Sequence, residues 1–141
     1  MVCPSCHNII YPRIAPAVIV GITHGDRILV TRYRDRPYRG LALIAGFCEI
    51  GETPEMTARR EAMEEAGLRI RDLRYFGSQP WGTAQDILAG FYCDVDGSPE
   101  IHIDKEELKL AEWKSREEIE LQPYEYSLTN EIMKQFKIGN I

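Results

Sequence analysis

The hydrophobic pattern of the chain predicts strands interleaved with two helices. Apolar, β-branched residues fill 15–22, and a second strand pattern covers 27–33 after the turn residues Gly25 and Asp26. Together these segments predict a hairpin. The apolar run 41–45 is too short for a helix and is bounded by glycines, so it predicts a buried strand. Further strand patterns cover 73–78, 87–94 and 111–113.

Two helices are predicted among these strands. The first covers 54–66, because Thr53 can cap it and Pro54 suits its first position. Gly67 supplies a left-handed end. The second helix is amphipathic and covers 128–136. Its expected inward-facing residues are Ile132, Met133 and Phe136. The interleaving indicates an α/β or α+β fold, in which helices cover a mixed sheet.

Composition indicates one globular domain and excludes several classes of protein. The chain has 141 residues, 44% hydrophobic and 28% charged, which suffices for one core. Its net charge of -5 gives no broad basic surface for DNA or an anionic membrane. No apolar run approaches the ~20 residues of a membrane span, and the first residues lack a signal-peptide pattern. We therefore expect a cytoplasmic protein.

Three glutamates on the first predicted helix are the main candidates for chemistry. Glu61, Glu64 and Glu65 are spaced i, i+3 and i+4, so at about 100° per residue they should converge on one side. A solvated acidic stripe is the ordinary interpretation. However, like charges at i, i+4 destabilise a helix, and compensating Lys or Arg is scarce at those spacings, which favours a bound cation such as Mg²⁺. The residues expected to face the core are Met56, Met63 and Ala66.

The sequence around this helix resembles the Nudix box. Gly46 is followed after five residues by Glu52, and after seven more by the string from Arg60 to Leu68, REAMEEAGL. Chance agreement at all the fixed positions is expected on the order of once in 10⁹ windows. The resemblance implies the Nudix fold, a mixed β-sheet sandwich flanked by helices. It also implies hydrolysis of phosphoanhydrides with Mg²⁺ or Mn²⁺.

The resemblance further implies roles for individual residues. Glu52 and Arg60 match the ion pair that orients the helix for catalysis. The carbonyl of Ala45, just before the box, is expected to complete the metal shell. The metal-binding glutamates of the family correspond to Glu61, Glu64 and Glu65, of which the last two are also expected to be catalytic.

A general base is needed to activate the attacking water. Candidates outside the box are Glu106 and Glu107, which lie in an acidic loop before the last strand pattern. Glu107 is favoured, because it falls on a metal-ligand position of the relatives described next. The alternative interpretation is an ordinary exposed acid in a charged loop.

The segment Ser78-Gln79-Pro80-Trp81 resembles the recognition motif of NADH pyrophosphatases, which hydrolyse NAD(H) to AMP and nicotinamide mononucleotide. The resemblance implies that Gln79, Pro80 and Trp81 bind substrate. A tryptophan after a rigid proline can offer a flat face to a base; the alternative is that Trp81 fills the core. Tyr11 matches a substrate-contacting position upstream.

The chain departs from that family after Trp81. Its motif normally continues with Pro-Phe-Pro and a serine, whereas here 82–86 reads GTAQD. The aromatic residue that would complete the base-binding wall is therefore missing, which puts the substrate in question. Asp86 stands at the position of the serine, where it could reject a phosphate or accept a hydrogen bond from a ribose or an amide.

The head of the chain, 1–14, resembles the end of that family's zinc ribbon, and 15–141 resembles the catalytic domain. Cys3 and Cys6 alone cannot close a tetrahedral Zn²⁺ site. Three alternatives follow: a metal-free relic, a two-fold dimer that brings both cysteines of each chain to one ion, or a site completed by His7 and an outside ligand. Cys48 and Cys93 stand alone, so no disulfide scaffold is expected.

Other functions are weighed against hydrolysis of NAD(H). The closest alternative is a Nudix hydrolase for ADP-ribose, another nucleoside diphosphate derivative or a nucleoside triphosphate. A non-catalytic nucleotide sensor has no need of the full set of glutamates. A zinc-knuckle module for nucleic acid is disfavoured by the acidic charge and the single close cysteine pair. NAD-capped RNA is retained as a substrate, and a homodimer is expected, from the resemblance alone.

Overall fold

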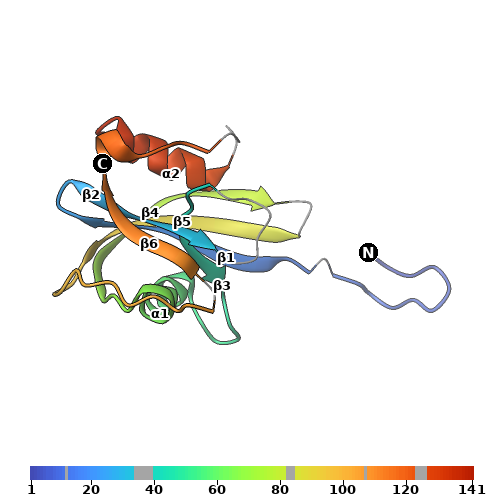
Figure 1. The fold of residues 1–141 in the computed structure, drawn as a ribbon. Coiled ribbons are helices and arrows are strands. Elements are labelled where there is room, and N and C mark those ends of the chain that lie inside the picture. Colours follow the sequence, from blue (N-terminus) through green and yellow to red (C-terminus); the bar gives the residue numbers. More distant parts are fainter. Residues whose placement is uncertain (12, 34–39, 82–84, 107, 123–126) are drawn as a thin grey trace.

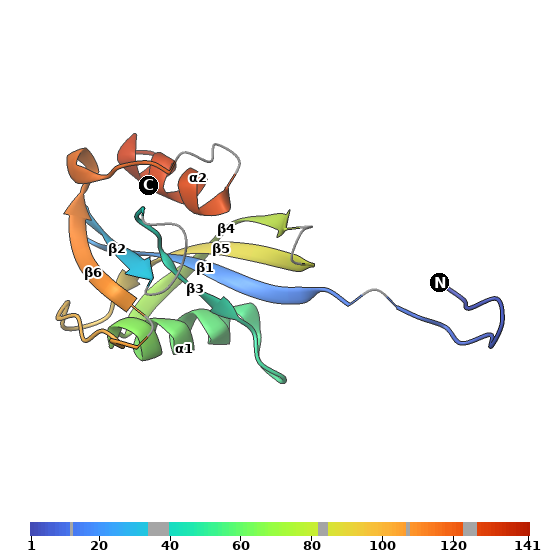
Figure 2. The same cartoon turned by 45° about the vertical axis from the view of Figure 1, so that its right-hand side comes forward.

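The structure places a mixed sheet between two helices. The computed structural model describes residues 1–11, 13–33, 40–81, 85–106, 108–122 and 127–141. Within these ranges six strands form one sheet, with α1 on one face and α2 on the other (Figure 1, Figure 2). In chain order the elements are β1 (Ala15–His24), β2 (Arg27–Tyr33), β3 (Ile44–Phe47), α1 (Pro54–Ala66), β4 (Ile70–Trp81), β5 (Asp86–Val95), β6 (Leu108–Ser115), the 3-10 turn η1 (Arg116–Glu118) and α2 (Leu128–Lys137).

Strand β1 is central to the sheet, and its two edges have different neighbours. One edge pairs in parallel with β5, starting at Ala15 opposite Asp86. The other edge is shared, because β2 pairs with it at Thr23 and His24 whereas β3 pairs with it over 17–20. The strand order is β4-β5-β1-β2-β6, with β3 beside β1. Strands β2 and β3 therefore pair with different ends of the same edge of β1. The segment that resembles the Nudix box begins in β3, close to the point where the two strands part.

Alternation along β1 sends successive side chains to opposite faces of the sheet. Val18, Val20 and Ile22 join the buried cluster beneath α1, whereas Ile19 joins the cluster beneath α2. The core therefore has two layers, one on each face, and each helix closes one of them.

Both helices have the predicted extent within one residue. At the start of α1 the Thr53 hydroxyl accepts a hydrogen bond from the Met56 N–H at 3.1 Å, and Gly67 ends the helix with a left-handed φ of 67°. Helix α2 buries the three predicted inward residues, Ile132, Met133 and Phe136. Of the helices in the described ranges, none is long and apolar enough to cross a bilayer.

The predicted core face of α1 is wrong in part. Met56 and Met63 are 52% and 46% exposed, while Ala66 is buried. Ala58 and Ala62 face the core with Ala66. Small side chains let the helix lie close against the large residues of the sheet, which already fill the space beneath it.

The strand predicted at 41–45 is displaced to Ile44–Phe47. Ala42 forms a single bridge with Thr31 of β2, after which the chain crosses to β1. The β-propensity of residues 41–45 cannot show where the chain leaves β2 and pairs with β1, because both of these strands are distant from it in sequence. The other three predicted strands are present as the longer β4, β5 and β6.

The head of the chain extends away from the body (Figure 1). Val2 and Ile9 form an isolated antiparallel bridge, and the turn between them contains Cys3 and Cys6. The division into 1–14 and 15–141 stays a prediction, since a short hairpin of this kind does not define a domain.

Gly67→Ala should destabilise the fold, with Gly97→Ala as a matched control. Both glycines have positive φ, 67° and 88°, so each substitution carries a backbone cost of about 1–2 kcal/mol. A Cβ at Gly67 would lie 2.9 Å from the His102 Cβ, whereas none of the described atoms lies within 4 Å at Gly97. We expect urea unfolding to show the larger loss of free energy for Gly67→Ala. Equal losses would show that the contact with His102 relaxes without cost.

Candidate active site

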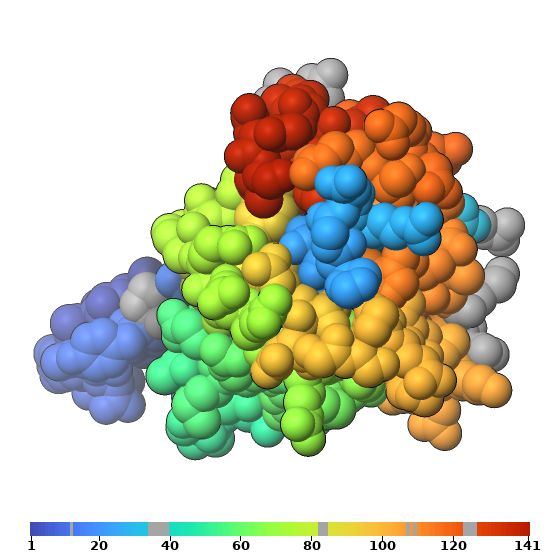
Figure 3. Space-filling view, turned by 90° about the vertical axis from the view of Figure 1, so that its left-hand side faces the viewer, coloured from blue at the N-terminus to red at the C-terminus, as the bar shows by residue number. Residues whose placement is uncertain are grey.

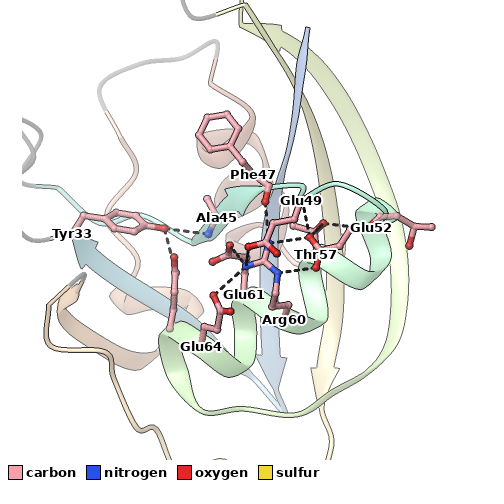
Figure 4. Close-up of polar contacts among 11 residues, drawn as sticks. Tyr33, Ala45, Phe47, Glu49, Glu52, Thr57, Arg60, Glu61 and Glu64 are labelled. Carbon is pink, nitrogen blue, oxygen red and sulfur yellow. Dashed lines mark hydrogen bonds and ion pairs between the residues drawn. The ribbon is translucent and has the colours of Figure 1, made fainter.

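Glu52 and Arg60 join the loop before α1 to the helix itself. Arg60 Nε donates to Glu52 Oε2 at 2.7 Å, and Nη2 donates to Glu52 Oε1 at 3.0 Å (Figure 4). Glu52 Oε1 also accepts hydrogen bonds from the Glu49 N–H and the Thr57 hydroxyl, both at 2.9 Å. These donors, Arg60 above all, lower the pKa of Glu52 to about 2. The expected ion pair is therefore present.

The remaining nitrogen of Arg60 lies among the predicted metal ligands. Its Nη1 donates to Glu61 Oε1 at 2.9 Å and to Glu64 Oε2 at 3.1 Å, and Nη2 also donates to the Phe47 carbonyl at 3.0 Å. The expectation that cationic compensation is scarce along this stripe is wrong. A guanidinium has five N–H donors in a rigid planar arrangement, which is enough to donate hydrogen bonds to the Glu52 carboxylate in the loop and to two carboxylates on the helix at the same time.

Glu61 and Glu65 are buried, unlike the acids of a solvated stripe. Their exposed fractions are 7% and 0%, whereas Glu64 is exposed. Burial raises the pKa of Glu61, and the charge of Arg60 opposes this rise. Gly46 permits the close approach of Glu61, because a Cβ there would lie 2.2 Å from the carboxyl carbon. The solvated-stripe interpretation therefore fails for both buried acids.

In donor type and burial these carboxylates suit a hard divalent cation. Glu61, Glu64 and Glu65 offer only oxygen, and a cation would offset the cost of burying negative charge. In the part of the chain that the structure describes, no three His, Cys, Asp or Glu side chains are grouped closely enough to hold a metal ion as they stand. Arg60 engages Glu61 and Glu64 instead. Convergence of the three glutamates on one ion stays a prediction.

A pocket of about 580 Å³ opens beside the carboxylate helix. Its walls come from the start of β1, β3 and the loop after it, the β4–β5 pair and the start of α2. Helix α1 contributes Arg60 and Glu61, and the β4–β5 pair contributes Trp81 and Asp86, which face each other across the two strands. Trp81 is 44% exposed, so the alternative of a core tryptophan is wrong. The pocket therefore brings Arg60 and Glu61 together with the predicted base platform, whereas Glu64 and Glu65 do not line it.

A second hollow, of about 640 Å³, lies at the opposite end of β1. Figure 3 looks onto that end, with the β1–β2 turn in blue. His24 and Trp113 line the hollow with their neighbours, and none of the predicted site residues does. The candidate active site is therefore at the end of the sheet where β1 begins.

The other predicted substrate residues lie outside this pocket. Gln79 and Pro80 precede Trp81 on β4 but do not line the cavity, whereas Ala45 does. Tyr11 is 72% exposed and belongs to the extended head. The structure therefore assembles only part of the predicted set within one chain.

Glu107, the favoured general base, lies outside the described residues. The loop that precedes it is attached to the end of α1, because the Asp104 N–H donates to the Glu65 carbonyl at 3.1 Å. The Glu106 N–H donates to Asp104 Oδ1 at 3.0 Å. The acidic loop is thus held next to the buried carboxylate helix.

Cys3 and Cys6 are free thiols in the head. Cys3 Sγ lies 3.3 Å from the Ser5 hydroxyl oxygen, and this hydrogen bond is the largest cause that lowers the pKa of Cys3 to about 6. A thiolate is the form that binds zinc, so the head can still supply ligands. Zinc binding at Cys3 and Cys6 stays a prediction.

Sequence patterns did not indicate Tyr33 or the start of α2 as parts of the site. The Tyr33 hydroxyl lies 3.5 Å from Glu65 Oε2, and Ser127 and Thr129 line the pocket. No sequence motif indicates that Tyr33 or the start of α2 belongs to the site. Both reach it through the packing of elements that are distant in sequence from the box.

The chain matches known proteins over most of its length. The family model described as NUDIX domain matches residues 12–136. The NAD-capped RNA hydrolase NudC of Klebsiella pneumoniae subsp. pneumoniae is 42% identical over 127 residues, which cover 87% of this chain and 48% of that protein. The protein of the same name from Photorhabdus laumondii subsp. laumondii is 41% identical over 121 residues, covering 86% and 47%. The chain thus spans about half the length of these curated relatives.

Solved structures agree on the fold. A NUDIX hydrolase from Nitrosomonas europaea superposes with a TM-score of 0.81 and 21% identity, covering 99% of this chain and 79% of that one. At this identity the likeness concerns the architecture alone.

Glu52→Gln should lower stability in a pH-dependent way. Folded Glu52 has a pKa of about 2, below its ordinary 4.5, so folding favours its ionised form. This contribution is complete above about pH 4.5 and is lost as the pH falls towards 2. We expect the Tm difference from the unmodified protein to be largest near neutral pH and to shrink through this window. Glu55→Gln, at an exposed acid in the first turn of α1, is the control. A loss of Tm for Glu52→Gln that does not change with pH would contradict the ionised, hydrogen-bonded state assigned to Glu52.

Proposed function

Because this chain belongs to the NUDIX domain family, we propose that it hydrolyses the pyrophosphate bond of NAD(H)-type dinucleotides to AMP and nicotinamide mononucleotide. The pocket that joins Arg60 and Glu61 to the exposed face of Trp81 carries this proposal. The names of the two NudC relatives, which refer to NAD-capped RNA, support a substrate that contains NAD. ADP-ribose or a nucleoside triphosphate is the alternative substrate of the same site.

The carboxylates of the box would hold a Mg²⁺ or Mn²⁺ ion. Such an ion supplies positive charge that offsets both the phosphates and the charge that builds in the transition state. The proposed ligands are Glu61, Glu64, Glu65, Glu107 and the carbonyl of Ala45. Arg60 donates to Glu52 in the loop and to the Phe47 carbonyl at the end of β3, so it holds both segments against α1 near Ala45.

Removal of a proton from the attacking water is assigned to Glu107. Attachment of the preceding loop to the Glu65 carbonyl supports this role, because it keeps the acidic loop at the buried end of α1. The oxygen of that water would form a new bond to one phosphorus while the bond from that phosphorus to the bridging oxygen breaks, and the other mononucleotide would leave with the bridging oxygen.

The substrate's base is proposed to stack on Trp81. Its side chain is partly exposed and lines the pocket. Gln79 and Pro80, also proposed to contact the substrate, precede it on β4 and pair with Leu88 and Ile87 of β5. Asp86 lies opposite Trp81 on β5 and can accept a hydrogen bond from a ribose hydroxyl or an amide. Its charge would also disfavour an additional phosphate at that position.

The head is proposed to serve a homodimer. We propose that 1–14 is a knuckle resembling part of a zinc ribbon and that 15–141 is the catalytic domain. Tyr11 lies in the extended head and away from the pocket of its own chain, so its proposed substrate contact is to the pocket of a second copy. A Zn²⁺ ion at Cys3 and Cys6 would need further ligands, which a second copy could supply.

Chromatographic product analysis tests the substrate. The protein is incubated with Mg²⁺ and, separately, NADH, NAD⁺, ADP-ribose, a nucleoside triphosphate and an NAD-capped RNA. We expect AMP and nicotinamide mononucleotide to form fastest from NADH or NAD⁺. Preference for ADP-ribose or the triphosphate would retain the chemistry and reject the substrate. Cleavage of none of them would favour a nucleotide-sensing domain, and cleavage of the capped RNA alone would move the assignment to RNA.

Glu65→Gln should lower kcat by several orders of magnitude with the fold intact. The amide keeps the size of this fully buried side chain but removes the negative charge that a divalent cation requires. The rate is measured on the best substrate, and circular dichroism checks the fold. Glu55→Gln, on the exposed side of the same helix, should keep normal turnover. Near-normal turnover by Glu65→Gln would contradict the metal assignment.

Trp81→Ala should mainly weaken substrate binding. Loss of base stacking is worth about 1–3 kcal/mol, so we expect KM to rise by about fivefold or more, with a smaller change in kcat. Tyr75→Ala is the control, because Tyr75 is an exposed aromatic residue on the same strand outside the pocket. An unchanged KM for Trp81→Ala would rule out stacking at this position.

A further inference from the structure

The hydroxyl of Tyr33 lies where three parts of the active site meet. Tyr33 ends β2, at a register shift against β6 that follows Arg32. Its hydroxyl accepts a hydrogen bond from the Ala45 N–H at 3.1 Å and can donate to the Leu43 carbonyl at 3.1 Å. The same oxygen lies 3.5 Å from Glu65 Oε2, at the outer limit of a hydrogen bond (Figure 4).

The separation of β2 from β3 explains why a side chain is needed here. Ala42 still exchanges two backbone hydrogen bonds with β2, at 2.7 and 2.8 Å, whereas β3 pairs with β1. Between these pairings the Leu43 carbonyl and the Ala45 N–H turn to the Tyr33 hydroxyl. The phenol thus takes the place of a neighbouring strand at the crossing, which satisfies backbone groups that must be paired when buried.

Two of the groups that contact this hydroxyl belong to residues of the proposed metal site. Glu65 is fully buried. The one hydroxyl proton of Tyr33 can be donated either to the Leu43 carbonyl or to Glu65 Oε2, and donation to the carboxylate would stabilise its charge. In an extended strand the N–H and C=O of one residue point to the same edge. The hydrogen bond that fixes the Ala45 N–H therefore also fixes the direction of the Ala45 carbonyl. One phenol sets a carboxylate on α1 relative to a carbonyl on β3.

We propose that Tyr33 is a positioning residue that holds Glu65 and Ala45 in place for the divalent cation. The inference rests on the proposed function only in that the site binds such an ion. Tyr33 lies on one flank of the carboxylates, and Arg60, which holds Glu61 and Glu64, lies on the other (Figure 4). Between them the two residues contact four of the five proposed ligand residues, Glu61, Glu64, Glu65 and Ala45.

Tyr33→Phe removes the hydroxyl and keeps the ring. Binding of Mn²⁺ alone to the full chain is measured by electron paramagnetic resonance titration, so the readout does not depend on turnover. We expect the Kd for Mn²⁺ to rise by about tenfold or more, as is typical when a partner of a metal ligand is lost. At saturating Mn²⁺, kcat on the best substrate should fall by about the same factor while KM changes little.

Tyr92→Phe is the matched control. Tyr92 donates to the Ile132 carbonyl beneath α2, on the other face of the sheet. This variant also loses one buried hydrogen bond, so it should lower Tm while leaving Mn²⁺ affinity and kcat unchanged.

A lowered Tm for Tyr33→Phe with unchanged Mn²⁺ affinity and kcat would show a merely structural role and overturn the proposal. Failure of the unmodified protein to bind Mn²⁺ would overturn it as well. If the unmodified protein binds Mn²⁺ but cleaves no NAD(H), the substrate assignment fails alone, and the comparison of Mn²⁺ affinities still decides the role of Tyr33.

Discussion

The hydrogen bonds of the Arg60 guanidinium hold the parts of the candidate active site together. One planar cation pairs with Glu52 in the loop, with the Phe47 carbonyl at the end of β3, and with Glu61 and Glu64 on the helix. It therefore joins three segments whose relative positions define the site. It also lowers the cost of placing acids in a partly desolvated position, because a buried negative charge is tolerated only beside a compensating group. A lysine could supply the charge but not this fork of directed donors.

The topology explains why the site lies where it does. Strand β1 takes β5 along one edge and divides the other edge between β2 and β3. Because β3 pairs with β1 beside β2, the start of the box lies over α1. Gly46 has no side chain, so β3 and the Glu61 carboxylate can approach more closely than any other residue would permit. On the opposite face, α2 begins at the rim of the same pocket. A single sheet thus separates the two core layers and supports the cavity at one end.

Features that depend on neighbours in sequence could be predicted, and those that depend on packing could not. The limits of α1 follow from Thr53 and Gly67, whose capping geometry is local. The spacing of Glu61, Glu64 and Glu65 singles them out as a candidate metal site, and the exposure of Trp81 excludes its burial in the core. The inward face of α1 was missed at Met56 and Met63, because periodicity identifies apolar residues but not how closely a sheet approaches. The position of Tyr33 beside Glu65 depends on a crossing between strands that no local pattern encodes.

The pocket is built from parts of the chain that are far apart. Its walls include Ala17 on β1, Trp81 on β4 and Thr129 on α2, and the parallel pairing of β1 with β5 closes a long loop. Such closures cost entropy and slow folding. During synthesis from the amino end, the helix with the box residues can form as soon as its own segment is available. The cavity, by contrast, is complete only once α2 has left the ribosome, so a nascent chain has its signature sequence long before it has the full pocket.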